Sequence, residues 1–146
     1  MTTKKYCAVV DTNVLVSALI TSNREAATVQ VLKMLLAGKF IPVYSSAVLA
    51  EYRAVLRREK FNLNINTIEF LIAAIEKFGL FIEPSESGEA LPDVKDLPFY
   101  EIVSEIKNND GYLITGNPKH FPERPYIVTA REFVDMICEQ RDKYAD

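Results

Sequence analysis

Short apolar runs alternate with segments of helical periodicity along the whole chain. β-Branched and aromatic residues fill these runs, and turn or polar residues bound them, as expected of buried strands. The predicted strands are Tyr6–Val10, Phe40–Tyr44, Leu80–Glu83, Tyr112–Thr115 and Tyr126–Val128. Alternation of strands and helices implies crossover connections and a mainly parallel sheet with helices on both faces. We therefore predict an α/β fold, a three-layer α/β/α domain around a sheet of about five strands.

Capping residues predict where the helices between these strands begin and end. A polar residue followed three positions later by Glu can exchange hydrogen bonds with the backbone at a helix start. The predicted starts are Ser22 with Glu25, Asn66 with Glu69, Thr129 with Glu132, Ser46 (for a helix to about Glu59), and Asp93 or Asp96. Gly38 and Gly79 stand just ahead of predicted strands, where a glycine commonly ends a helix at the C′ position.

The length of 146 residues suits a single domain that spans residues 1–146. No apolar run approaches the roughly 20 residues that cross a bilayer, and Met1–Lys5 leads directly into a strand without room for a signal peptide. Cys7 and Cys138 stand in apolar patterns, so we expect both to be reduced core residues. A cytoplasmic protein without membrane contact is the resulting expectation.

The net charge of −3 gives no support to broad, basic nucleic-acid binding. It does not exclude a nuclease, because a cluster of metal-binding carboxylates lowers the charge at one spot. Basic residues gather at two places, Arg53, Arg57, Arg58 and Lys60, and then Lys119, His120 and Arg124. Each cluster is either a solvated face or a contact for phosphate groups.

Asp11 directly follows the first predicted strand. Ligands of open α/β sheets bind beyond the carboxyl ends of the strands, so Asp11 is well placed to hold a metal or attack a substrate. The alternative is that Asp11 or Asn13 forms an Asx-turn or a helix cap. Thr115 and Asn117 follow the fourth predicted strand in the same way and would lie beside Asp11. Asp110 precedes that strand, roughly 20 Å from its far end at about 3.3 Å per residue, and is expected to be a turn residue.

Glu51 lies at the border of the apolar face of the helix predicted from Ser46. Its neighbours three and four positions away are apolar, so no local cation can pair with it. Burial of this carboxylate would require a distant partner, either a metal ion or an Arg. The alternative is that Glu51 bends outward into water.

Two further carboxylates, Asp93 and Asp96, stand at the mouth of the next predicted helix. Capping explains one of them, since Pro98 in the first turn fits a helix start at Asp96. Together they place negative charge where the ligand crevice of the sheet opens. We expect Asp96 to be a ligand, and Asp93 to support it or to be an ordinary surface residue.

Asp11, Glu51 and Asp96 form an oxygen-rich set, which suits Mg²⁺ or Mn²⁺ and not zinc or copper. Such an ion can activate water and neutralise charge in phosphodiester cleavage. His120 is the only histidine and is too isolated for a zinc site. No Ser-His-Asp or Cys-His nucleophile set is apparent, and no glycine-rich phosphate loop follows the first strand.

Four segments in order resemble the PIN-domain ribonucleases, in particular the small prokaryotic toxins of toxin–antitoxin pairs. They are YCAVVDTNVLVSALI, SAVLAEYRAVLRREKF, DVKDLPFYEIVSEI and YLITGNPKHFP. The resemblance covers about Tyr6 to Val134. It implies a PIN-like fold, hydrolysis of RNA with Mg²⁺ or Mn²⁺, and, as partners, an antitoxin protein and a second copy of the chain in a homodimer.

Carried over by position, the resemblance implies that Asp11, Glu51 and Asp96 are the catalytic and metal-binding residues. Asn13 and Thr115 match polar positions that support these ligands.

The chain departs from the family pattern at Asn117, where a fourth acidic residue is usual. The change removes one negative charge and favours one ion over two, although Asp93 would replace part of that charge. Lys119 is expected to steer a substrate phosphate, and His120 either does the same or packs in its loop. A homodimer would use an exposed apolar patch. Three residues either form such a patch or belong to the core: Phe70, Leu71 and Phe78.

Two other functions are compatible with an Asp after a strand. A catalytically weak PIN domain would bind RNA or a partner protein, as Asn117 and the acidic net charge suggest, and would not need an intact carboxylate set. A phosphotransfer domain is the other. The haloacid-dehalogenase kind requires an Asp where Asn13 stands, and the response-regulator kind requires one where Ser45 and Ser46 follow a strand. The phosphotransfer class therefore fits poorly.

Overall fold

A computed structural model describes residues 5–144, and the side chains of residues 5–140. Five short strands form one sheet. They are β1 (Cys7–Val10), β2 (Ile41–Tyr44), β3 (Leu80–Phe81), β4 (Gly111–Ile114) and β5 (Ile127–Val128). Each corresponds to a predicted strand, with ends that differ by one or two residues.

Six α-helices and three short 3₁₀ helices complete the described elements. The α-helices are α1 (Thr12–Ile20), α2 (Ala27–Leu36), α3 (Ser46–Leu56), α4 (Ile65–Phe78), α5 (Leu97–Ile106) and α6 (Ala130–Tyr144). The 3₁₀ helices are η1 (Glu59–Phe61), η2 (Val94–Asp96) and η3 (Pro118–His120). Among the described residues, no helix combines the length and the apolar character needed to span a membrane.

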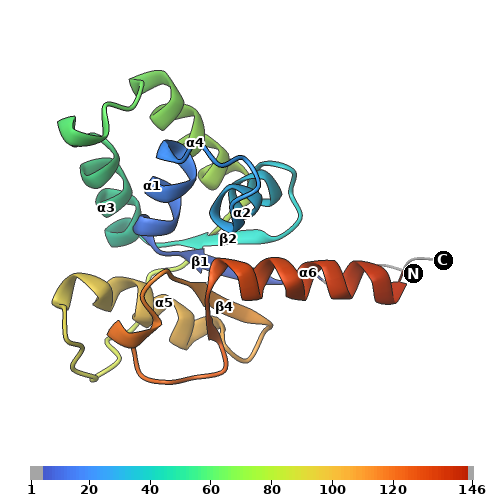
Figure 1. Cartoon of the computed structure of the whole chain (residues 1–146). Helices are drawn as coiled ribbons and strands as arrows, with labels where there is room; N and C mark the ends of the chain where they lie inside the picture. The colour runs from blue at the N-terminus through green and yellow to red at the C-terminus, as the bar shows by residue number, and fades with distance from the viewer. Residues whose placement is uncertain (1–4, 145–146) are drawn as a thin grey trace.

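All strand pairs are parallel, in the order β3-β2-β1-β4-β5. Figure 1 shows α1 to α4 on one side of the sheet and α5 on the other. Helix α6 packs against α2. The predicted three-layer α/β/α fold with a parallel five-stranded sheet is therefore confirmed.

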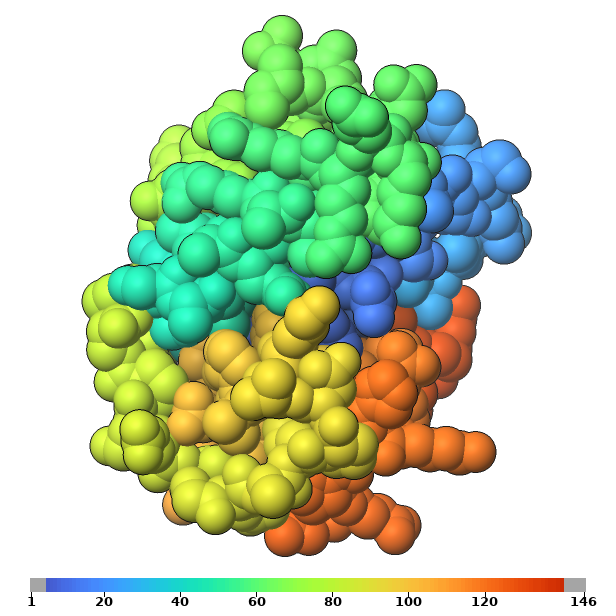
Figure 2. All heavy atoms as spheres, turned by 90° about the vertical axis from the view of Figure 1, so that its left-hand side faces the viewer, coloured from blue at the N-terminus to red at the C-terminus, as the bar shows by residue number. Residues whose placement is uncertain are grey.

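Strands β1 and β4 lie at the centre and pair over their whole length, from Cys7 opposite Gly111 to Val10 opposite Ile114. Because the strands are parallel, β1, β2 and β4 all end at one edge of the sheet. Figure 2 looks at the molecule from the side on which the chain leaves these strand ends. There the start of α1 (blue) reaches the surface between α3 (green), the segment before α5 (yellow) and the η3 segment (orange). Asp110 lies at the opposite end of β4 from Thr115, in a left-handed conformation (φ 57°), as expected of a turn residue.

The capping box predicted at Thr129 is confirmed. The Glu132 N–H donates to Thr129 Oγ1 (3.1 Å), and the Thr129 N–H donates to Glu132 Oε1 (2.9 Å). The box predicted at Ser22 is wrong. Helix α2 begins at Ala27 without a side-chain cap, and Asn23 takes the N–H of Glu25 in a turn instead.

Two other helix starts lie one or two residues before their predicted positions. Ser45, and not Ser46, caps α3 by accepting the N–H of Val48. Asn64, and not Asn66, caps α4, since its side chain accepts the Asn66 N–H at 2.7 Å. In both cases a polar side chain just upstream satisfies the free N–H groups of the first turn. Helix α3 ends at Leu56, and the predicted end at Glu59 is the start of η1.

The cysteine prediction holds for one residue only. Cys7 is buried in β1, and Cys138 is exposed on α6, so the prediction that Cys138 is a core residue is wrong. Helix α6 buries Phe133 and Val134 and turns Cys138 away from the core. Both cysteines are free.

The two glycines that end helices do so for different reasons. Gly38 has the left-handed backbone (φ +71°) expected at C′. Gly79 directly follows α4, as predicted, but its backbone is extended (φ −95°) and it occupies the C-cap position instead of C′. A Cβ atom at Gly79 would collide with the carbonyl oxygens of Ile75 and Pro42. The absence of a side chain therefore lets α4 end directly against β2.

We expect Gly79→Ala to destabilise the protein by about 1–3 kcal/mol, because two backbone carbonyl groups would have to move. Gly116→Ala is the matched control, since a Cβ there meets nothing within 4 Å. Urea unfolding should show a lower midpoint for Gly79→Ala and an unchanged midpoint for Gly116→Ala. Equal midpoints for both variants would contradict this account of the α4–β2 contact.

Candidate active site

Asp11 lies directly after β1, beside Thr115 at the end of β4. The Thr115 hydroxyl donates to Asp11 Oδ2 at 2.7 Å, and both residues are buried. The backbone N–H of Asn13 approaches Asp11 Oδ1 at 3.4 Å, so Asp11 also caps α1. The capping and site interpretations of Asp11 are therefore compatible.

Thr115 connects Asp11 to the loop after β4. Its Oγ1 accepts the backbone N–H of Asn117 at 3.0 Å while its hydrogen points to Asp11. The Asn117 side chain is exposed. The Asn13 side chain is also exposed, and only its backbone contacts Asp11. Of the four predicted supporting residues, Thr115 contacts Asp11 through its side chain and the two asparagines act through their backbone. The fourth, Asp93, caps η2.

Glu51 is directed toward the end of β1. Thr12 Oγ1 donates to Glu51 Oε2 at 2.7 Å, and the Glu51 side chain is half-buried. The next residue, Tyr52, is buried and donates its hydroxyl hydrogen to the Val10 carbonyl oxygen. These two hydrogen bonds fix α3 on the strand end. Glu51 therefore does not bend outward into water.

Asp96 and Asp93 have different surroundings. Asp93 is exposed and caps η2 by accepting the Lys95 N–H at 2.9 Å. Asp96 makes no cap hydrogen bond at the start of α5, and its side chain is only 16% exposed. Its buried Oδ2 has no hydrogen-bond partner in the described part of the chain and lies 3.3 Å from Nδ1 of His120. Asp93 thus acts as the cap, which leaves the Asp96 carboxylate available.

Burial and neighbouring charges shift the pKa values of the carboxylates at this edge. Burial raises the pKa of Asp11, although hydrogen bonds from Thr115 and Asn13 oppose the shift. Burial, the charge of Asp11 and the charge of Asp93 raise the pKa of Asp96, with His120 opposing.

The charges of these carboxylates also affect the hydroxyl group of Tyr52. Burial is the main reason that the pKa of Tyr52 lies above its usual range, and the charges of Asp11 and Glu51 raise it further. Negative potential is therefore concentrated at the carboxyl edge of the sheet.

The chemistry of these residues fits a hard divalent cation. A cation would stabilise the ionised form of carboxylates whose pKa values are raised. The buried Oδ2 of Asp96 has an ion-pair contact with His120 but no hydrogen bond among the described residues. The carboxylates are spread apart: among the described residues, no group of three His, Cys, Asp or Glu side chains lies close enough together to hold an ion. The donor types fit Mg²⁺ or Mn²⁺. Glu51 accepts a hydrogen bond from Thr12 in this arrangement.

The basic clusters differ in what they can offer a phosphate. Arg53 and Arg57 pair with Glu76 and Glu69 on α4, at 3.5 and 2.6 Å. This cluster therefore behaves largely as a solvated helix face. In the η3 segment, Lys119 is exposed, and within the described residues it has no ion-pair partner.

Two positioning residues were missed in the sequence. Thr12 looks like an ordinary first residue of a helix, and Tyr52 falls on the apolar face of α3. The pattern gives no signal that their hydroxyl groups bond Glu51 and the end of β1.

We expect the unfolding free energy of Asp96→Asn, relative to that of the wild type, to increase as the pH rises in the presence of EDTA. Because the pKa of Asp96 is raised in the folded protein, the folded state binds this proton more tightly than the unfolded chain. That contribution is present below the unfolded pKa of about 3.9 and is lost as pH rises through the folded pKa. The variant has no such titration. Unfolding free energies at several pH values between 4 and 7 measure the difference.

Asp135→Asn, which removes an exposed acid on α6, is the matched control for the loss of one carboxylate. A constant offset between Asp96→Asn and the wild type across this range would contradict the electrostatic account.

Comparison with known proteins gives one result. The PIN domain family model matches residues 7–119, from the start of β1 into η3. No curated protein and no solved structure matches the chain. The matched range contains Asp11, Glu51, Asp93 and Asp96, and PIN domains are usually nucleases. Since the match covers most of the chain and the fold agrees, the protein belongs to the PIN domain family.

Proposed function

We propose that the protein is a metal-dependent endoribonuclease that hydrolyses RNA phosphodiester bonds. The observation that carries the proposal is the set of carboxylates at the carboxyl edge of the sheet. Burial raises the pKa of Asp11, and burial together with the charges of Asp11 and Asp93 raises the pKa of Asp96. The buried Oδ2 of Asp96 has an ion-pair contact with His120 but no hydrogen bond among the described residues. Such a site costs stability unless a cation is present, which is typical of a functional site.

Asp11 and Asp96 are the proposed ligands of Mg²⁺ or Mn²⁺, with Glu51 as the third carboxylate. When bound, the ion supplies a Lewis acid that activates water and offsets negative charge on the phosphate. Thr115 fixes one oxygen of Asp11, and Thr12 orients Glu51.

Around these carboxylates, two residues of η3 have separate proposed roles. His120 lies against Asp96 and orients its carboxylate. We therefore assign His120 to the positioning of Asp96, and Lys119 to the attraction of substrate phosphate.

Asn117 supports one bound ion per chain. An amide at this position carries no charge, and the Asn117 contact with the site is through its backbone N–H. Asp93 is exposed and engaged as a cap, so it acts on Asp96 through charge alone. The set thus has fewer negative charges than a two-ion site would need.

The second candidate is a PIN domain that binds RNA or a protein without efficient cleavage. Two observations favour it: Asn117 carries no charge, and among the described residues no three carboxylates lie close enough together to hold a metal ion. This candidate needs the surface of the site but not its charge.

The likeness to small prokaryotic toxins supports a role as the toxin of a toxin–antitoxin pair, acting in the cytoplasm with an antitoxin as partner. Two free cysteines suit such a reducing compartment. For the proposed homodimer, Phe70 (66% exposed) and Phe78 (42% exposed) on α4 are available, whereas Leu71 belongs to the core.

We expect purified protein to cleave mixed cellular RNA with Mn²⁺ or Mg²⁺, and to lose at least about 100-fold in rate in EDTA or as the Asp11→Asn, Asp96→Asn double variant. Asp135→Asn should cleave like the wild type. Gel analysis of the RNA over time measures the rates, and expression of the wild type, but not of the double variant, should arrest growth of the host.

Two outcomes would count against this function. Equal cleavage by the double variant would assign the activity to a contaminant. No cleavage with any metal, together with RNA binding by wild type and double variant alike, would support the binding-module candidate.

A further inference from the structure

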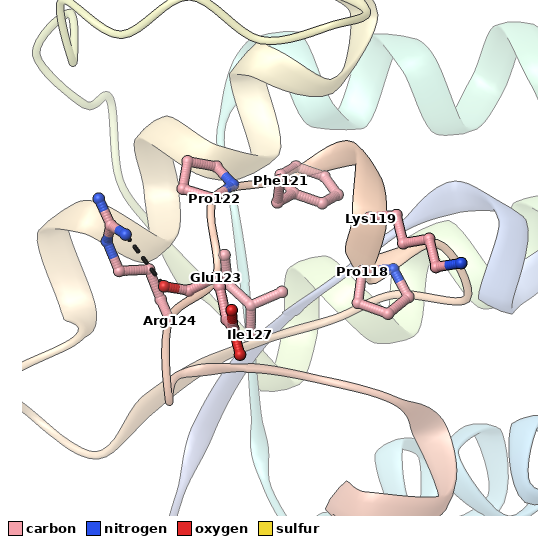
Figure 3. Close-up of a pocket in the computed structure, with 7 residues that line it drawn as sticks. All are labelled: Pro118, Lys119, Phe121, Pro122, Glu123, Arg124 and Ile127. Carbon is pink, nitrogen blue, oxygen red and sulfur yellow. Dashed lines mark hydrogen bonds between the residues drawn. The ribbon is translucent and has the colours of Figure 1, made fainter.

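We propose that a pocket beside the active site binds one nucleoside of the RNA strand next to the phosphate that is cleaved. The inference deepens the proposed ribonuclease function and rests on it. The pocket has a volume of about 300 Å³ and lies between η3 and β5 (Figure 3). Its apolar lining consists of Pro118, Phe121, Pro122 and Ile127, and its charged lining of Lys119, Glu123 and Arg124.

The pocket is connected to the active site by a short piece of chain. Asn117, which bonds Thr115 through its N–H, directly precedes η3. His120, the last residue of η3, lies 3.3 Å from Asp96. Lys119 stands between these two contacts in the sequence and lines the pocket. A strand of RNA with one phosphate at Asp96 would therefore reach the pocket with the adjoining nucleoside.

The walls of the pocket are fixed before any ligand arrives. Phe121 is buried and stacks on Tyr100, with ring centroids 6.4 Å apart and an interplanar angle of 21°. Ile127 belongs to β5 and pairs with Leu113 of β4. Together with the two proline rings, these residues form a rigid apolar surface, which suits the face of a base or a ribose better than a phosphate alone.

Two cations stand at opposite ends of the pocket (Figure 3). Lys119 is exposed and, in the described part of the chain, has no ion-pair partner. Arg124 is held at the rim by a hydrogen bond of 3.0 Å from Nη1 to the Glu123 carbonyl. Its ion pair with Glu89 is long (3.9 Å) and exposed on both sides, so it offers little resistance to a phosphate. The two cations can therefore bind the phosphates on either side of one nucleoside.

The Glu123 carboxylate favours a nucleoside over a third anionic group at the centre of the pocket. Its carboxylate lies between the two cations in Figure 3, and no hydrogen bond or ion pair with another described residue engages it. A phosphate in the centre of the pocket would be repelled there. An amino group of a base or a ribose 2′-hydroxyl can instead donate a hydrogen bond to Glu123.

The test measures binding of a labelled single-stranded RNA in EDTA, where metal-dependent cleavage is suppressed. Lys119→Gln with Arg124→Gln should weaken binding at least tenfold at low salt. It should also reduce the slope of log affinity against log salt by about 1.4, since each phosphate contact to a single strand contributes about 0.7. The charge-matched control is Lys33→Gln on α2 with Lys39→Gln in the turn that follows α2, two exposed residues whose replacement should leave affinity and slope unchanged. Melting temperatures confirm that all variants fold.

A competition arm separates a nucleoside pocket from a plain anion site. A nucleoside 3′,5′-bisphosphate should displace the RNA at least tenfold better than inorganic pyrophosphate. Equal competition, or equal RNA affinity in the pocket and control variants, would overturn the pocket proposal. The cleavage assay on the same preparations judges the nuclease separately. Cleavage with an unaffected RNA affinity refutes only the pocket, and reduced affinity without any cleavage by the wild type refutes only the nuclease.

Discussion

The parallel pairing of β1 with β4 is the constraint on which the site depends. The Asp11 N–H donates to the Ile114 carbonyl (2.9 Å), which extends the ladder one residue past the strand end and brings Thr115 to Asp11. Helix α3 is fixed to the same point, because Tyr52 donates to the Val10 carbonyl. A slip of one residue would turn the side chains of β1 to the opposite faces and separate Asp11 from its partner.

The apolar residues packed behind this edge hold two carboxylates where burial disfavours their ionised form. Burial raises the pKa of Asp11 and Asp96, and the charge of Asp11 raises the latter further. Real proteins accept such local costs at functional sites and offset them with well-packed cores. On the proposed function, positive charge reaches the site from two sources, a bound ion at the carboxylates and the exposed cations Lys119 and Arg124 on the flank.

Much of this arrangement could be predicted from sequence, because strand ends and their polar followers are local signals. The five strands, the layer order and the position of Thr115 beside Asp11 follow from them. Glu51 could be singled out because it lacked a local cation, but its partner Thr12 is thirty-nine positions away and could not be identified. The missed caps show a further limit, since several polar residues compete for each helix start and packing decides between them, as at Asn64.

The central claim is that the carboxylates at this edge bind a divalent cation. Calorimetric titration of Mn²⁺ into the protein without RNA tests it directly, with Asp96→Asn as the site variant and Asp135→Asn as the matched control. The account predicts about one ion per chain, because Asn117 carries no charge, and at least tenfold weaker binding by Asp96→Asn alone. Equal Mn²⁺ affinity in all three proteins, or no binding by the wild type, would contradict it.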